Sequence, residues 1–151
     1  MQRGKLLRSN HDKNTKAEIL VVDDELLIRD LLFDFLSSQG FTAHLAENGR
    51  KAIEMIDNIK FQVALVDLKM PEMDGIEFTG YLHKAKPEIP VIIMTAYPSM
   101  DSAIESIKNG VYDYIVKPFK IANLFEIIKN AICEYEMRIK SGYAPHGAMK
   151  G

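Results

Sequence analysis

The feature that most constrains the fold is an alternation of short apolar runs, rich in Val and Ile, with longer amphipathic stretches, repeated five times along the chain. Such an alternation predicts strands joined by helical crossovers. Apolar runs without a polar face indicate a parallel sheet that is covered on both sides and has right-handed connections. The predicted strands are residues 19–23, 41–46, 61–67, 91–95 and 113–117.

Capping residues and apolar periodicity place the five helices. Asn48, Asp74 and Ser99 are predicted N-caps, and Glu77 completes a capping box with Asp74. The first helix is predicted at about residues 25–38, before Gly40, and the last at about 121–138. Five strand–helix units predict a three-layer α/β sandwich of the flavodoxin-like kind, with a parallel sheet in the order 2-1-3-4-5.

Apolar side chains at helical spacing predict which face of each helix lies on the sheet. The predicted inward face of the first helix is Leu27, Leu31, Leu32, Phe35 and Leu36. That of the helix after Ser99 is Met100, Ala103, Ile104 and Ile107. In the last helix, Leu124, Ile128 and Ile132 are predicted to face the sheet. The same helix carries apolar positions beyond one stripe, which suggest a surface for self-association: Phe125, Ile128, Ile132, Tyr135 and Ile139.

Polar side chains stand at the carboxyl ends of four predicted strands. Asp23 and Asp24 follow the first strand, and Asp67, Thr95 and Lys117 end the third, fourth and fifth. In the order 2-1-3-4-5 these four strands are neighbours, so their ends line one cleft. Clustered carboxylates repel unless a cation neutralises them, and oxygen ligands without His or Cys favour Mg²⁺. Since Mg²⁺ prefers to share phosphate oxygens, a phosphoryl group is the expected second occupant, with Lys117 and Thr95 as its contacts.

Composition bounds the remaining possibilities. The 151 residues suit one domain, and a net charge of -2 predicts no direct binding of nucleic acid. No apolar run approaches the roughly 18 residues that span a bilayer. The single cysteine, Cys133, predicts a cytoplasmic protein without an internal disulfide and is itself expected to pack in the core. Residues 1–17 are expected to be a disordered leader, 18–140 the domain and 141–151 a flexible tail.

Four motifs at the predicted strand ends carry a resemblance to a known family. The segments ILVVDDE, LVDLKMPEMDG, IMTAY and YDYIVKPF, in this order, resemble the receiver domain of two-component response regulators. The resemblance extends from about residue 18 to 137. The segments TAYPSM and VYDYIVKPF are most similar to receivers of nitrogen-regulation-type activators.

The resemblance implies a role for each residue of the acidic site. Asp67 is implied as the phosphoacceptor, and Asp24 and Asp67 as direct ligands of Mg²⁺. Asp23 is implied to act through a water molecule, and the backbone carbonyl of Lys69 to supply a further ligand. Lys117 is implied to contact the phosphoryl group, and its peptide bond to Pro118 to be cis.

The resemblance also implies a conformational switch and its partners. Thr95 and Tyr114 are implied as the switch residues, which alter the surface formed by the helix after Ser99, the strand 113–117 and the last helix. The phosphoryl donor would be a histidine kinase, a phosphotransfer protein or a small phosphodonor, and a homodimer could form through the altered surface. The chain would assist its own phosphorylation and dephosphorylation rather than act as an enzyme on a separate substrate.

Rival functions lack their required residues. A phosphatase with an aspartyl nucleophile needs a carboxylate two residues after it, where this chain has Lys69. The P-loop pattern GxxxxGK[ST] is absent, and DDELL stands where a flavin carrier needs a phosphate-binding loop. A receiver used only for docking is disfavoured because the phosphorylation residues are complete. A stand-alone signalling module and the input part of a longer protein, cut at about residue 140, both stay open.

Overall fold

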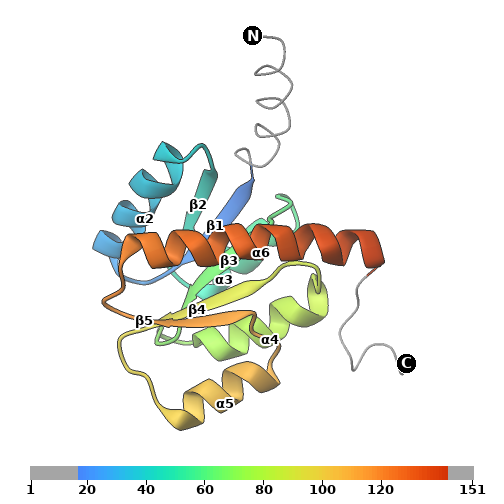
Figure 1. Cartoon of the computed structure of the whole chain (residues 1–151). Helices are drawn as coiled ribbons and strands as arrows, with labels where there is room; N and C mark the ends of the chain where they lie inside the picture. Colours follow the sequence, from blue (N-terminus) through green and yellow to red (C-terminus); the bar gives the residue numbers. More distant parts are fainter. Residues whose placement is uncertain (1–16, 143–151) are drawn as a thin grey trace.

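The computed structural model describes residues 17–142, which form five strands and five helices in alternation (Figure 1). The elements are β1 (Glu18–Val22), α2 (Leu26–Ser38), β2 (Thr42–Ala46), α3 (Gly49–Ile56), β3 (Val63–Asp67), α4 (Gly75–Ala85), β4 (Val91–Thr95), α5 (Met100–Lys108), β5 (Asp113–Val116) and α6 (Ile121–Ser141). Every predicted element is present, and the strand predicted at 91–95 agrees at both ends. Residues 1–16 of the predicted leader and 143–151 of the predicted tail lie outside the described residues. Ala17, placed in the leader, is buried in the domain, and Ser141, placed in the tail, ends α6.

The sheet is parallel throughout and has the predicted order β2-β1-β3-β4-β5. The chain reverses its direction of winding between β1 and β3, where a crevice opens beyond the carboxyl ends of the strands. Register aligns these ends, because Asp67 pairs with Met94 and Thr95 pairs with Val116. The flavodoxin-like three-layer prediction is therefore confirmed.

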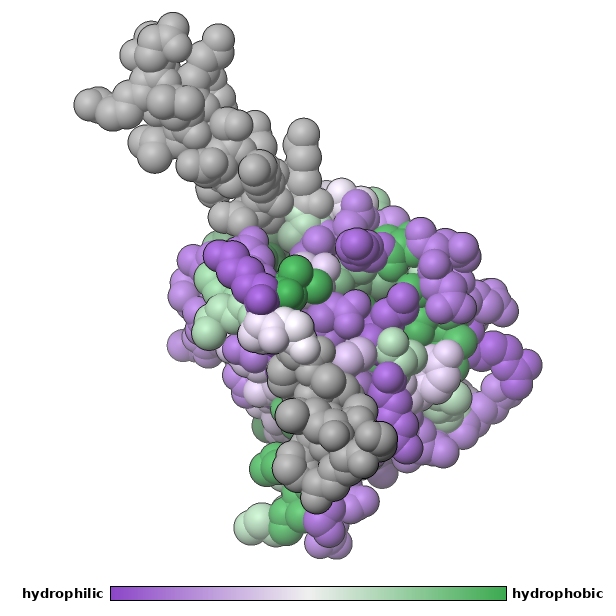
Figure 2. All heavy atoms as spheres, turned by 90° about the vertical axis from the view of Figure 1, so that its right-hand side faces the viewer, coloured by the Kyte–Doolittle hydropathy of each residue, from purple (hydrophilic) through white to green (hydrophobic). Residues whose placement is uncertain are grey.

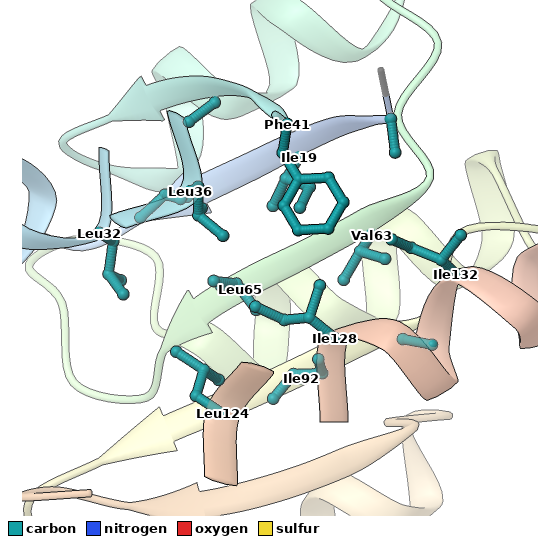
Figure 3. Packing of buried hydrophobic residues seen from close by; sticks show 14 of the residues in the cluster. Ile19, Leu32, Leu36, Phe41, Val63, Leu65, Ile92, Leu124, Ile128 and Ile132 are labelled. Carbon is teal, nitrogen blue, oxygen red and sulfur yellow. The ribbon is translucent and has the colours of Figure 1, made fainter. Parts of the chain in front are cut away.

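Alternate residues of each strand face opposite sides of the sheet and form two cores. On one side, Ile19 and Leu65 pack with α2 and α6, as Figure 3 shows. On the other side, Leu20 and Val66 pack with α3 and α4. The central strands are therefore buried on both faces, as their continuous apolar sequences predict.

The predicted helix caps are confirmed. The side chain of Asn48 accepts a hydrogen bond from the Lys51 amide at 2.9 Å. Asp74 and Glu77 form the predicted capping box at the start of α4. Ser99 caps α5 by accepting from the third amide of that helix. These contacts satisfy amides that have no partner within the helix.

The predicted inward face of α2 is only partly right. Leu32 and Leu36 are buried, whereas Leu27 is 82% exposed and Leu31 is 52% exposed. The helix carries apolar residues on nearly every side, so periodicity alone could not decide which stripe would meet the sheet. The sheet accepts the stripe that also packs against α6.

The predicted inward face of α5 is wrong. Met100 is 75% exposed, Ile104 44% and Ile107 72%, and the buried side chain of this helix is Ser106. The Ser106 hydroxyl donates to the carbonyl of Ser102 at 2.7 Å, so burial leaves it with a hydrogen bond. Apolar surface accordingly appears at the lower end of the molecule in Figure 2, the level at which α5 lies in Figure 1.

The predicted association stripe of α6 belongs mainly to the core. Ile128, Ile132 and Tyr135 are buried, and Phe125 packs edge-on against Phe35 at 5.6 Å between ring centroids. Ile139, at 52% exposed, is the most accessible of the predicted positions. These residues therefore hold α6 on the domain and do not offer a continuous docking face.

Cys133, expected in the core, is exposed on α6. The reason is that its neighbours Ala131 and Ile132 occupy the face that meets the sheet.

Among the described helices, none combines the length and apolar character needed to cross a membrane.

Candidate functional site

The site lies where four parallel strands end. Asp23 directly follows β1, Asp67 and Thr95 are the last residues of β3 and β4, and Lys117 directly follows β5. The Asp23 amide still donates to the Ala46 carbonyl of the neighbouring strand at 3.1 Å, which fixes the backbone at this point. Strand order thus brings together side chains that are separated by up to 94 positions in sequence.

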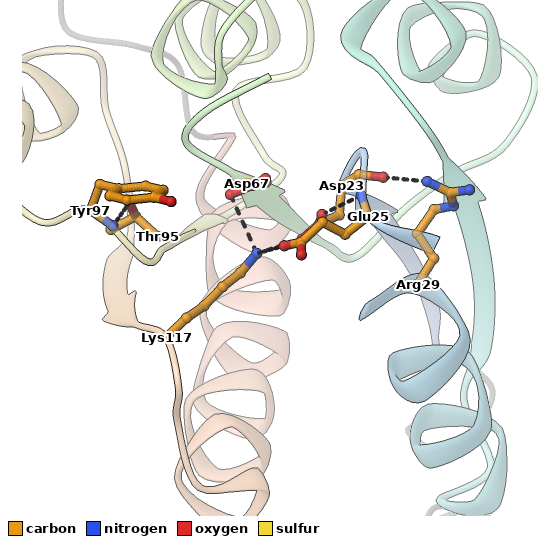
Figure 4. Close-up of polar contacts among 7 residues, drawn as sticks. All are labelled: Asp23, Glu25, Arg29, Asp67, Thr95, Tyr97 and Lys117. Atoms are coloured by element: carbon orange, nitrogen blue, oxygen red, sulfur yellow. Dashed lines mark hydrogen bonds and ion pairs between the residues drawn. The ribbon is translucent and has the colours of Figure 1, made fainter. Parts of the chain in front are cut away.

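The ammonium group of Lys117 is the centre of the polar cluster (Figure 4). Its Nζ lies 2.9 Å from a carboxylate oxygen of Asp23, 3.4 Å from Glu25 and 3.5 Å from Asp67. The side chains of Asp23 and Lys117 are 0% and 9% exposed, respectively. A buried cation shared by three carboxylates is far less screened by water and salt than a surface ion pair.

Burial dominates the ionisation of Asp67. Desolvation, and secondly the charge of Asp23, raise the pKa of Asp67 from 3.8 to about 7, against the opposing influence of Lys117. For Lys117, burial lowers the pKa, but its hydrogen bond to Asp23 and the surrounding carboxylates outweigh burial and leave the pKa raised. One ammonium group therefore does not compensate the negative charge at Asp67.

One group of carboxylates includes Glu25, a residue for which the sequence predicted no role. Oxygens of Asp23, Glu25 and Asp67 lie within 4.8 Å of one another. Asp24 is exposed and is not part of this group among the described residues, and Lys69 is exposed as well. Glu25 ends the acidic run DDE, and that run was the only sequence feature that could have indicated it.

The backbone around Asp23 explains how Glu25 reaches the cluster. A side-chain oxygen of Asp23 accepts a hydrogen bond from the Glu25 amide at 2.9 Å. The Arg29 guanidinium donates to the Asp23 carbonyl at 2.8 Å, also drawn in Figure 4. This turn brings Glu25 to Lys117. Asp24 is exposed, and its charge helps to raise the pKa of Asp67. The three carboxylates supply only oxygen donors, a set that suits Mg²⁺.

Thr95 is buried next to the cluster, and its oxygen accepts a hydrogen bond from the Tyr97 amide at 2.9 Å. Tyr97 itself is 69% exposed, and Figure 4 shows Thr95 and Tyr97 on the opposite side of Asp67 from Glu25. The other predicted switch residue, Tyr114, is half-buried on β5, and its hydroxyl lies 2.8 Å from that of Ser102. The Lys117–Pro118 peptide bond is cis, as predicted.

Gly75 allows α4 to begin directly against the backbone of Asp67. A Cβ atom at Gly75 would lie 2.3 Å from the Asp67 carbonyl oxygen and 2.9 Å from the Cα of Leu68. The Gly75 amide donates to the Leu68 carbonyl at 2.8 Å. Gly75 therefore positions the Asp67 loop and is more than a break between elements.

An apolar groove adjoins the cluster. Its volume is about 350 Å³, and its walls come from the loop before α2, from α2 itself, and from the loops that follow β4 and β5. It is lined by Glu25, Ile28, Leu31, Ala96, Lys117, Pro118 and Phe119. Glu25 and Lys117 belong to both the groove and the cluster, so a molecule in the groove would touch the site.

Comparison with known proteins shows what the chain is similar to. Residues 19–129 match the family model described as "Response regulator receiver domain". The regulatory protein AtoC of Escherichia coli is 40% identical over 114 residues, which cover 76% of this chain and 25% of that protein. The DNA-binding transcriptional regulator NtrC of Escherichia coli is 36% identical over 118 residues, 78% of this chain and 25% of that protein. The chain thus spans about a quarter of the length of these curated relatives.

Solved structures show the same similarity. A CheY-like receiver domain protein from Methanospirillum hungatei superposes with a TM-score of 0.79 at 32% identity, over 82% of this chain and 98% of that one. NtrX from Brucella abortus, solved with ADP, gives a TM-score of 0.78 at 29% identity, over 84% of this chain and 29% of that one.

Proposed function

The chain belongs to the response regulator receiver family, and on that premise we propose that it is a phosphorylation-dependent switch with Asp67 as phosphoacceptor. The observation that carries the proposal is the convergence of Asp23, Glu25 and Asp67 on one buried ammonium group, that of Lys117. A cluster that needs further positive charge, beside a carboxylate that can act as a nucleophile, is suited to phosphoryl transfer.

The transfer itself uses groups of this chain. A carboxylate oxygen of Asp67 attacks the phosphorus of a phosphohistidine donor, an O–P bond forms, and the P–N bond breaks. The electrons of that bond return to the imidazole, which takes up a proton from water. Lys117 stabilises the negative charge on the transferring group, and Thr95 can donate to it because its oxygen already accepts from Tyr97. The chain thereby assists its own phosphorylation and the later hydrolysis of the acyl phosphate.

Magnesium completes the site in this proposal. Asp24 and Asp67 would hold Mg²⁺ directly, Asp23 through water and Lys69 through its carbonyl, and the ion would neutralise charge that Lys117 leaves uncompensated. Glu25 is the rival of Asp24, because Glu25 lies in the cluster and Asp24 does not. Titration of Asp24→Asn and Glu25→Gln with Mg²⁺ tells the two candidate ligands apart. If Glu25→Gln loses more affinity for Mg²⁺ than Asp24→Asn does, Glu25 replaces Asp24 as the direct ligand.

The proposed acceptor is tested by intact mass after incubation with Mg²⁺ and acetyl phosphate. We expect one added phosphoryl group on the wild type and none on Asp67→Asn. Asp34→Asn is a matched control, since it removes an exposed carboxylate on α2 outside the cluster. A stable phosphorylated form of Asp67→Asn under the same conditions would contradict the assignment.

The proposed donor is a histidine kinase or a phosphotransfer protein. The groove beside Lys117 and the exposed side chains of Leu27 and Leu31 offer an apolar surface next to Asp67, which a protein donor must approach. Leu27→Asp should slow transfer from a protein donor and leave labelling by acetyl phosphate unchanged. Equal slowing with both donors would remove this surface from the proposal.

The proposed output surface is α5, β5 and α6. After phosphorylation Thr95 would turn toward the phosphoryl group and Tyr114 would move into the space it leaves, which alters this surface. Met100, Ile104 and Ile107 supply exposed apolar area on α5, so self-association through α5 replaces the predicted α6 stripe. Sedimentation with and without beryllofluoride tests this self-association. If the domain stays a monomer at every concentration, the surface would instead bind a different protein.

Two expectations stay predictions. Absence of direct nucleic-acid binding follows from the net charge of -2. A cytoplasmic location follows from the use of a single cysteine.

A further inference from the structure

A hydrogen bond between two hydroxyl groups joins β5 to α5. Tyr114 Oη and Ser102 Oγ are 2.8 Å apart, and both residues are half-buried. The Tyr114 ring packs against the core on the side of the sheet that α3 and α4 cover. Among the side-chain hydrogen bonds of residues 17–142, this contact is the one that links α5 to the sheet.

The Ser102 hydroxyl is also part of the cap of α5. It lies 3.3 Å from the Ser99 amide, 3.0 Å from Ser99 Oγ and 3.1 Å from the Ser99 carbonyl. A hydroxyl group has one hydrogen to donate and two lone pairs. These limits are met when Ser102 donates to the Ser99 carbonyl and accepts from Tyr114 and from one of the two Ser99 donors, the amide or the hydroxyl. The first turn of α5 and the Tyr114 side chain therefore share one hydroxyl group.

Apolar packing holds α5 only weakly. The buried side chain of this helix is Ser106, while Met100 and Ile107 are 75% and 72% exposed. A helix that buries little apolar surface depends more on each polar contact, and opens locally at lower cost than its neighbours. The contact between Ser102 and Tyr114 thus affects both the orientation of the tyrosine and the attachment of α5.

We propose that Ser102 is a positioning residue of the switch, whose hydrogen bond holds Tyr114 against α5 in the unphosphorylated arrangement. The inference rests on the proposed function, in which Tyr114 turns toward Thr95. That movement breaks the hydrogen bond to Ser102, so the first turn of α5 loses its link to β5 at the moment of activation. Phosphorylation at Asp67 is in this way transmitted to the exposed apolar face of α5.

A double-mutant cycle tests this coupling. The measured quantity is the affinity of the domain for beryllofluoride in the presence of Mg²⁺, by calorimetry, for the wild type, Ser102→Ala, Tyr114→Phe and the double variant. Each single substitution removes the same contact from the inactive arrangement, so each should raise the affinity about fivefold, the effect of one net hydrogen bond. The double variant should gain no more than either single variant.

The design separates the contact with Tyr114 from the capping role of Ser102. Tyr114→Phe leaves the hydroxyl contacts between Ser99 and Ser102 intact, and Ser102→Thr keeps a hydroxyl and should restore wild-type affinity. If Ser102 acts only as a cap, Ser102→Ala has the same effect in the presence and absence of the Tyr114 hydroxyl, and the proposal is overturned.

Hydrogen exchange supplies a second readout. The amides of Met100 to Ala103 should exchange faster in Tyr114→Phe, although its cap is unchanged, and unaltered exchange in that variant would also overturn the role of Ser102. If wild type fails to bind beryllofluoride, the proposed function fails together with this inference. A different outcome would remove only the role of Ser102. In that case the wild type binds beryllofluoride, Asp67→Asn does not, and the effects of Ser102→Ala and Tyr114→Phe on affinity add in the double variant.

Discussion

Replacing Asp67 by Asn should stabilise the metal-free domain, by an amount that grows with pH. Burial and Asp23 raise the pKa of Asp67 from 3.8 to about 7 in the folded chain. Between these values the folded state retains a proton that the unfolded chain has lost, so the free energy of unfolding falls as pH rises. Asn carries no charge at any of these pH values, and Asp67→Asn therefore escapes this loss.

The structure sets the size of the effect. A pKa that rises from 3.8 to about 7 corresponds to about 4 kcal/mol, at about 1.4 kcal/mol for each pH unit. The stability gained by Asp67→Asn should be near zero at pH 3, increase between pH 4 and 7, and stay constant above about pH 8. Lys117 keeps its contacts with Asp23 and Glu25 in the variant, so no unpaired cation offsets the gain.

Urea unfolding in EDTA from pH 3 to 9, for the wild type, Asp67→Asn and Asp34→Asn, measures this difference. Titrating groups far from residues 34 and 67 are common to the three proteins and cancel when the curves are subtracted. Addition of Mg²⁺ should stabilise the wild type more than Asp67→Asn, because the proposed site would hold the ion in the native state through this carboxylate. A difference between wild type and Asp67→Asn that does not change with pH, or an Asp67→Asn that is less stable at pH 8, would refute the reasoning.

Three other predictions follow from packing. Gly75→Ala should lower the free energy of unfolding by about 2 to 4 kcal/mol, because its Cβ would lie 2.3 Å from the Asp67 carbonyl oxygen. The Cβ of Gly80→Ala would meet only the side chain of Asn109, which can move, so this variant is the control in urea unfolding. Leu32→Ala should lower the free energy of unfolding by about 2 to 5 kcal/mol, and Leu27→Ala by less than about 0.5 kcal/mol, since Leu32 is buried and Leu27 is 82% exposed on the same helix. Equal losses of stability in the two variants would contradict the inward face assigned to α2. Tyr97 follows Thr95 by two residues and is 69% exposed, and we propose that its side chain limits the access of water to the acyl phosphate. Tyr97→Ala should then speed hydrolysis of the acyl phosphate severalfold, which the decay of phosphorylated mass measures, and an unchanged rate would exclude this role.

The sequence by itself determined the sheet and the position of its site. Continuous apolar strands can be buried only between two layers of helices, and right-handed crossovers leave few strand orders. Asp23, Asp67, Thr95 and Lys117 stand at strand ends, so any fold with that order brings them together. Caps such as Asn48 were predictable because they depend on residues within one turn.

Tertiary structure decided which helix faces are buried and which carboxylates meet. The apolar residues of α5 have the spacing of an inward stripe, yet Ser106 is buried and Ile107 is exposed in the folded chain, where α5 contacts α4. The adjacent residues Asp24 and Glu25 differ for a similar reason, since hydrogen bonds to Asp23 set the turn that carries them. Periodicity measures how strongly a helix is amphipathic, but its rotation on the sheet depends on contacts with distant segments, and these exist only in the folded chain.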